Sequence, residues 1–88
     1  MIYRVDLTDV TTKQQFHERV QDGIPCPEYY GKNLDALYDV LMELSGSVEV
    51  VFEHFQEFSH HMPGYAEAVE HMCEDVAAEM LELTICLE

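Results

Sequence analysis

The sequence predicts an α/β fold in two layers, with a three-stranded parallel sheet packed with about four helices. Its 88 residues, 48% of them hydrophobic, suffice for one core. The predicted elements follow the order strand, helix, helix, strand, helix, helix, strand. Strands joined by helical crossovers form parallel sheets with right-handed connections. Because so few helices accompany three strands, we expect the helices to form one layer and the sheet the other. The whole chain, residues 1–88, should form a single domain.

The three predicted strands are short. Ile2–Leu7 alternates between apolar and polar side chains, which is typical of a strand with one buried face. Val48–Glu53 is rich in β-branched residues and is expected to lie at the centre of the sheet. The apolar run Leu83–Leu87 is the last strand.

The first predicted helix covers about residues 13–22. Thr11 and Thr12 each precede a glutamine by three residues, which is the spacing of a capping box. Gly23 is expected to end this helix.

Two helices are predicted in the second half of the chain. Residues 54–61 can form a short helix, and Pro63-Gly64 is expected to break the chain. A long amphipathic helix from about Tyr65 to Met80 should follow. Its apolar side contains Tyr65, Val69, Met72, Val76 and Met80, and its polar side contains Glu67, Glu70 and Glu74.

The remaining helix carries the candidate binding residues. Asn33 is a good N-cap, and the helix should reach about Leu44, before Ser45-Gly46-Ser47. Asp35 and Asp39 are four residues apart and therefore project together. The core side should contain Leu34, Leu37, Val40, Leu41 and Leu44. Tyr38 and Met42 flank the two carboxylates, as apolar side chains do in interface cores.

Two aromatic residues precede this helix. Tyr29 and Tyr30 stand in a turn with Gly31, where rigid rings offer contact area at a low entropy cost. We expect Tyr30 to pack in the core beneath the turn and Tyr29 to be exposed. The alternative for the acidic pair alone is an ordinary solvated helix face.

The charge is strongly negative, with 18 Asp and Glu against 4 Lys and Arg and a formal net charge of -14. Such a field repels nucleic acid and anionic membranes and attracts a basic protein. The alternative is that the acidic residues only aid solubility.

The cysteines and the apolar runs indicate the compartment. Cys26, Cys73 and Cys86 are an odd number without paired spacing, and we expect the last two to be small core residues. This favours a reducing cytoplasm without disulfides. The N-terminus lacks the features of a signal peptide, and no apolar run approaches the roughly 20 residues of a membrane span.

The segment Pro27–Leu41 closely resembles the barstar family, which are intracellular inhibitors of the ribonuclease barnase. The resemblance includes Glu-Tyr-Tyr-Gly and Asn-Leu-Asp-Ala-Leu at residues 28–31 and 33–37. It extends more loosely over the whole chain, through its length, its element order and the terminal run Leu83–Leu87. The resemblance implies a barstar-like fold in which the acidic helix and the preceding turn plug a ribonuclease active site.

The resemblance also implies roles for single residues. Asp39 would occupy the pocket meant for the scissile phosphate, Asp35 would pair with adjacent basic groups, and Tyr29 would stack on the catalytic histidine. Gly31 and Asn33 would let the two backbones approach closely. In the family, a carboxylate late in the last helix makes a further contact with the partner, and Asp75 stands at the matching position here. The complete predicted partner-binding set is Tyr29, Gly31, Asn33, Leu34, Asp35, Tyr38, Asp39, Met42 and Asp75.

The chain departs from the family pattern at several positions. Tyr38 stands where Trp is common, Asp75 is shorter than the expected Glu, and Lys32 replaces a common acidic residue. Ser45-Gly46-Ser47 lacks the aromatic side chain that may follow the helix. These departures concern the identity of the partner more than the inhibitory role.

Other functions are possible. Glu53, Glu57 and the histidines at positions 54, 60 and 61 suggest a small metal site, but no compact metal motif is present. Asp35 and Asp39 lack a pocket that would make them an acid–base pair. An immunity or antitoxin-type module for an unrelated toxin nuclease, or a nucleic-acid mimic, shares the charge argument. We expect no enzyme activity, no cofactor or metal, and a monomer in the free state, with a basic small ribonuclease as partner.

Overall fold

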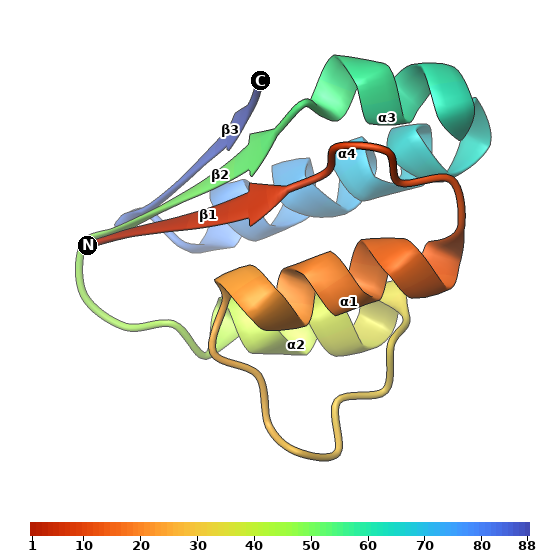
Figure 1. The fold of residues 1–88 in the computed structure, drawn as a ribbon. Coiled ribbons are helices and arrows are strands. Elements are labelled where there is room, and N and C mark those ends of the chain that lie inside the picture. The colour runs from red at the N-terminus through yellow and green to blue at the C-terminus, as the bar shows by residue number, and fades with distance from the viewer.

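The computed structural model describes residues 1–88 and contains the seven elements in the predicted order (Figure 1). They are β1 (Ile2–Asp6), α1 (Lys13–Gly23), α2 (Leu34–Met42), β2 (Val48–Glu53), α3 (Phe55–His61), α4 (Pro63–Glu79) and β3 (Leu83–Leu87). No helix combines the length and the apolar character that crossing a membrane requires.

The three strands form one parallel sheet in the order β1-β2-β3, so the β-branched strand is central as predicted. The connection from β1 to β2 and the connection from β2 to β3 both move in the same direction across the sheet. Right-handed connections that do so place their helices on the same face of the sheet. The burial along β2 agrees with this arrangement. Val48, Val50 and Phe52 belong to the core cluster, whereas Glu49 and Glu53 on the other face are half-exposed.

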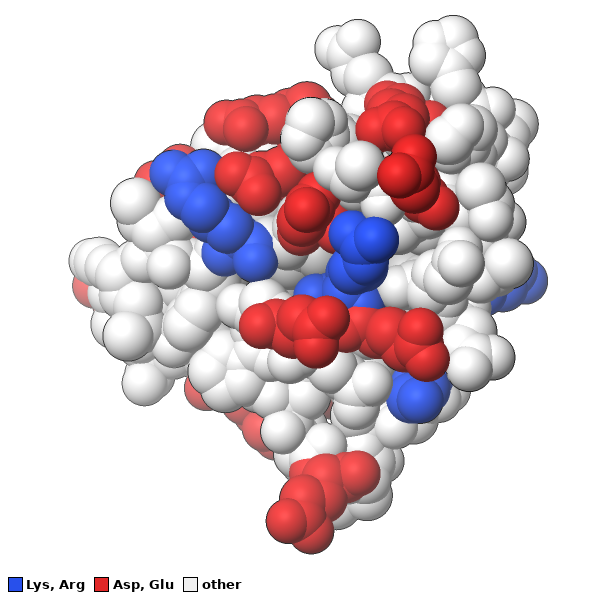
Figure 2. Space-filling view, in the orientation of Figure 1, with Lys and Arg blue, Asp and Glu red and all other residues white.

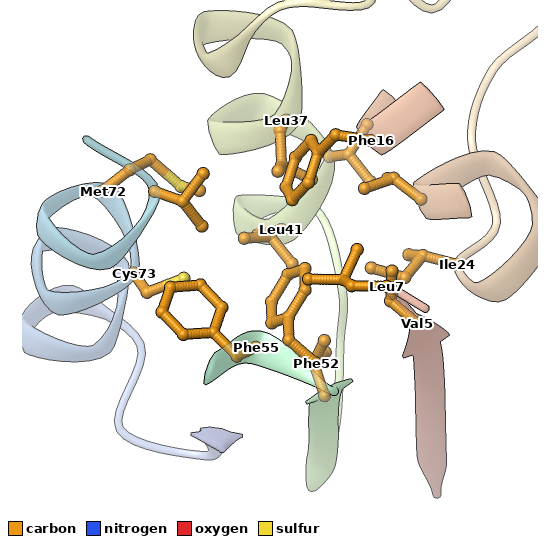
Figure 3. Close-up of a cluster of buried hydrophobic side chains, with 14 of the residues drawn as sticks. Val5, Leu7, Phe16, Ile24, Leu37, Leu41, Phe52, Phe55, Met72 and Cys73 are labelled. Carbon is orange, nitrogen blue, oxygen red and sulfur yellow. The ribbon is translucent and has the colours of Figure 1, made fainter. Parts of the chain in front are cut away.

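The core lies between the sheet and the helices. In Figure 3, Leu37 of α2 lies beside the ring of Phe16, and Leu41 lies beside that of Phe52. Cys73 of α4 lies beside Phe55. The ring of Phe16 from α1 stacks on that of Phe52 at 6.2 Å and on that of Phe58 at 5.1 Å between centroids. Aromatic contacts of this kind add stability beyond the area that they bury.

The start of α1 uses the predicted threonine–glutamine pairing. The hydroxyl oxygen of Thr12 accepts a hydrogen bond from the backbone N–H of Gln15 at 3.1 Å. The side-chain oxygen of Gln15 in turn accepts from the N–H of Thr11 at 2.8 Å. Two of the amide groups near the helix start thereby gain partners.

Several sequence predictions were wrong in detail. The chain breaks between α3 and α4 as predicted, but α4 begins at Pro63 instead of Tyr65, because proline at the first helical position loses no hydrogen bond. The second helix ends at Met42 instead of Leu44. Cys86 is not a core residue: it is half-buried on the open face of the sheet, and its thiol donates to a carboxylate oxygen of Glu49 at 3.3 Å. This bond raises the pKa of the Cys86 thiol.

Gly23 marks a close approach between α1 and the edge of the sheet. A Cβ atom at this position would lie 2.2 Å from the carbonyl oxygen of Arg4 in β1. No side chain can be accommodated there unless the helix or the strand moves. Gly23 is the last residue of α1 instead of lying just beyond it, and its role is this contact.

We therefore expect Gly23→Ala to destabilise the protein by about 2 kcal/mol or more, since overpacking against backbone forces the helix away from the strand. Urea unfolding measures the change. Gly64→Ala is the matched control because open space surrounds Gly64 in α4, and alanine there should leave stability unchanged or slightly raised. A Gly23→Ala protein as stable as the wild type would contradict this account of the α1–β1 contact.

Candidate functional site

The start of α2 is fixed by its capping residue. The side-chain oxygen of Asn33 accepts a hydrogen bond from the N–H of Ala36 at 2.8 Å, and its side-chain nitrogen donates to the carbonyl of Gly31 at 3.3 Å. Lys32, between them, has a left-handed backbone with φ of 52°. The Asn33 side chain thus holds the turn against the helix, and both ends of its amide are engaged within the chain.

The turn is also anchored to the core from below. Tyr30 is only 7% exposed, and its hydroxyl lies 2.6 Å from Nδ1 of His17 in α1. Nε2 of His17 lies 2.6 Å from the hydroxyl of Tyr65 in α4. Since a neutral imidazole has one donor and one acceptor nitrogen, one tyrosine donates to His17 and the other accepts from it. The Tyr30–His17–Tyr65 network therefore ties the turn to two helices.

Burial fixes the protonation states in this network. Desolvation lowers the pKa of His17 to about 4, with a further contribution from the Lys32 ammonium. Burial also raises the pKa of Tyr30 and of Tyr65. At neutral pH all three groups are therefore uncharged, and both hydrogen bonds can form without burying a charge.

Tyr29 faces outward, as the sequence predicts, with 88% of its surface exposed. An open hollow of about 410 Å³ lies between its turn and α2. The hollow is lined by Pro27, Tyr29, Tyr30, Gly31, Ala36, Asp39, Val40, Met42 and Glu43. The structure thus brings four of the predicted site residues, including Asp39, around one depression with aromatic, apolar and acidic walls. We refer to it as the Tyr29–Asp39 hollow.

The other side of α2 contacts α4. The hydroxyl of Tyr38 donates a hydrogen bond to a carboxylate oxygen of Glu79 at 3.1 Å. This bond raises the pKa of Tyr38, and the negative charges of Glu79, Asp75 and Asp39 act in the same direction. Asp75 is exposed and close enough to Tyr38 for its charge to be felt there. The predicted acidic residue of α4 therefore lies beside α2.

The remaining predicted residues differ in how much surface they offer. Asp35 is exposed on α2, one turn before Asp39. Leu34 and Met42 are half-buried and pack against the core, so only part of each side chain can meet a partner. A Cβ at Gly31 would lie 3.3 Å from the Asn33 side-chain nitrogen, a tight contact to which that amide would have to adjust.

Apart from Lys32 in the turn before α2, positive charge lies elsewhere on the molecule. No Lys or Arg follows Lys32 in the sequence, so α2 and α4 carry none. Arg4 on β1 pairs with Glu53 at 3.2 Å, and Arg19 on α1 lies 3.9 Å from the carboxylate of Asp6. Figure 2, which looks onto β1 and α1, shows Lys and Arg atoms lying between those of Asp and Glu. The carboxylates of α2 and α4 are left without cationic neighbours of this kind.

Sequence reasoning missed three residues of this region. His17 is fully buried next to Phe16, and its place in α1 between the apolar residues Phe16 and Val20 was a usable signal of burial. Glu43 follows the predicted acidic pair by four residues, which places it on the same side of the helix. Glu79 gave no local signal, because only the packing of α4 against α2 brings it to Tyr38.

The histidine and glutamate residues around α3 do not form a metal centre. No three His, Cys, Asp or Glu side chains gather in an arrangement that could hold a metal ion. His54 instead starts α3 with a left-handed backbone, φ 61°.

Comparisons with known proteins cover the whole chain. A family model described as "Barstar (barnase inhibitor)" matches residues 1–88. A protein of Bacillus subtilis (strain 168) named "Putative ribonuclease inhibitor YrdF" is 29% identical over 80 residues, which is 86% of this chain and 85% of that relative. The similarity therefore extends over the turn, α2 and the surrounding fold.

The His17 network predicts a loss of stability in mild acid. The folded-state pKa of His17 is near 4 and its ordinary value is 6.5, so below pH 6.5 the unfolded chain binds a proton that the folded protein does not. The free energy of unfolding should therefore fall by about 2 kcal/mol between pH 7 and pH 5 through this group alone.

Urea unfolding at both pH values, on the wild type and on His17→Gln, measures this effect. The remaining histidines and the carboxylates are common to both proteins, so the difference between their pH slopes isolates His17. Equal slopes in the two proteins would show that His17 does not resist protonation.

Proposed function

Because the chain belongs to the barstar family, we propose that it inhibits a small, basic ribonuclease by covering the active site of the enzyme. The Tyr29–Asp39 hollow, together with the exposed carboxylates of α2 and α4, is the proposed binding surface. Family membership indicates an inhibitor and not an enzyme. The proposed mode of action is occlusion, without chemistry of its own.

One observation supports this proposal above the others. The side chains of Tyr29 and Asp39, ten residues apart in sequence, line the same depression although they come from different structural elements. A carboxylate beside an exposed ring offers the two features of a nucleotide that a ribonuclease must bind, a negative group and a flat apolar surface. Asp39 would take the place of the RNA phosphate, and Tyr29 would stack on a ring in the active site.

The neighbouring residues extend this surface. Asp35 would pair with basic groups beside the phosphate pocket, and Asp75 would add a contact from α4. Tyr38, Met42 and Leu34 would supply the apolar contact area around the carboxylates. Gly31 and Asn33 would shape the turn so that the backbones of the two proteins approach closely, with the Asn33 side chain acting through its cap on α2.

The anchoring of the turn favours tight binding. Because Tyr30 is fixed through His17, the backbone of the turn has less conformational freedom to lose when the adjacent Tyr29 binds. We propose that the free protein is a monomer of the cytoplasm, where its three free cysteines would stay reduced.

Inhibition assays test the proposal directly. The purified chain should abolish RNA cleavage by at least one member of a panel of small basic microbial ribonucleases at near-stoichiometric amounts. Inhibition of an unrelated toxin nuclease, with no effect on any ribonuclease of this kind, would favour an immunity-type module for another class of enzyme.

Single substitutions should have unequal effects on binding. We expect Asp39→Ala to weaken inhibition most, by at least about tenfold, with Tyr29→Ala and Asp35→Ala next. The reason is that basic groups of the enzyme would remain buried without a partner. Inhibition constants and dissociation rates provide the measurement. Glu67→Ala is the matched control, since Glu67 is exposed on the polar side of α4. Equal losses in the three variants that remove a carboxylate would indicate that bulk charge does the binding.

Salt should slow association. The net charge of -14 attracts a basic enzyme from a distance, and this attraction is screened over about 8–10 Å at moderate ionic strength. Stopped-flow measurements should show an association rate that falls as the salt concentration rises, with a smaller change in the dissociation rate. An association rate that is independent of salt would contradict electrostatic steering.

A further inference from the structure

The large apolar side chains that this protein exposes are not scattered. Leu81 is 92% exposed, Met1 77% and Ile2 54%. All three line one hollow at the N-terminal end of the sheet. Tyr29 of the candidate site is the other exposed large apolar residue. Exposed apolar residues that cluster, unlike single ones, indicate an interaction surface.

Leu81 also belongs to a second, adjacent hollow of about 460 Å³. It lies between the connection that follows α2 and the end of α4. Its lining consists of Leu44, Ser45, Gly46, Glu79, Met80, Leu81 and Glu82. The connection supplies Leu44 and the small residues Ser45 and Gly46, so the apolar area comes from Leu44, Met80 and Leu81, with carboxylates at the margin. We name this area the Leu81 surface.

The Leu81 surface continues the proposed ribonuclease-binding surface. Glu79 lines the hollow of Leu81 and accepts the hydrogen bond from Tyr38 on α2. Just beyond the C-terminal end of α2, Glu43 lines the Tyr29–Asp39 hollow. The next residue, Leu44, lines the hollow of Leu81. Consecutive residues after α2 therefore line the two depressions.

The charge at the margin identifies the occupant. A second copy of this chain would bring Glu79 and Glu82 of both molecules together, with no Lys or Arg after Lys32 to offset them. An apolar floor with an acidic margin is complementary to an apolar side chain flanked by basic groups. A basic protein, the same class of partner that the Tyr29–Asp39 hollow requires, fits both areas at once.

We propose that the Leu81 surface is a second contact area for the same basic ribonuclease, which would place there an apolar residue flanked by Lys or Arg. This inference rests on the proposed function. It adds an apolar contact, contributed by the α4–β3 connection, to a binding surface that is otherwise acidic and aromatic. The apolar contact should act mainly on the lifetime of the complex, because burial of apolar area slows dissociation more than it alters encounter.

The test uses the full chain and a basic ribonuclease that the wild type inhibits. Leu81→Ser should weaken binding about tenfold, chiefly through faster dissociation. Its thermal unfolding should match the wild type because the side chain is exposed. Ala68→Ser is the control, since Ala68 is an exposed apolar residue of α4 that lines neither hollow, and its effect should stay below about twofold.

Three results would overturn the inference while leaving the proposed function intact. They are unchanged binding by Leu81→Ser, equal losses in Leu81→Ser and Ala68→Ser, and a wild-type dimer in sedimentation that Leu81→Ser dissociates. The last would make a second copy of the chain the occupant. A wild-type chain that inhibits no basic ribonuclease would overturn the proposed function and this inference together.

Discussion

The two hydrogen bonds of His17 hold the turn of the candidate site to the rest of the molecule. Tyr30 and Tyr65 come from opposite halves of the chain, and the imidazole joins them at 2.6 Å on each side. Because Tyr30 is fixed in this way, the adjacent Tyr29 is left pointing into solvent beside α2. The binding surface is therefore a consequence of core packing, since its most exposed ring follows directly after one of the buried ones.

The charge distribution complements this rigid arrangement. Both arginines lie on β1 and α1 and are near carboxylates of the same region. From Asn33 onward, the chain has acidic residues without any Lys or Arg. A strong negative field and a preformed hollow thus coincide on the side of α2 and α4. Long-range attraction and short-range fit would act on the same partner.

Local sequence signals predicted most of the fold. The Asn33 cap, the β-branched central strand and the inward positions of α4 depend on neighbouring residues, and all three were found. The start of α4 was misplaced because Pro63 was read as a breaker, although proline is also favoured in the first helical turn. The roles of His17 and Glu79 depend on contacts 48 and 41 residues away along the chain. No local pattern could have predicted those partners.

The most direct test of the preformed surface is a crystal structure of the chain bound to a ribonuclease that it inhibits. We expect Tyr29 and Asp39 to be buried in the active-site cleft of the enzyme, with the hydrogen bonds of His17 to Tyr30 and Tyr65 retained. A complex in which the enzyme binds another face, or in which the turn leaves His17 in order to bind, would contradict a rigid surface that imitates RNA.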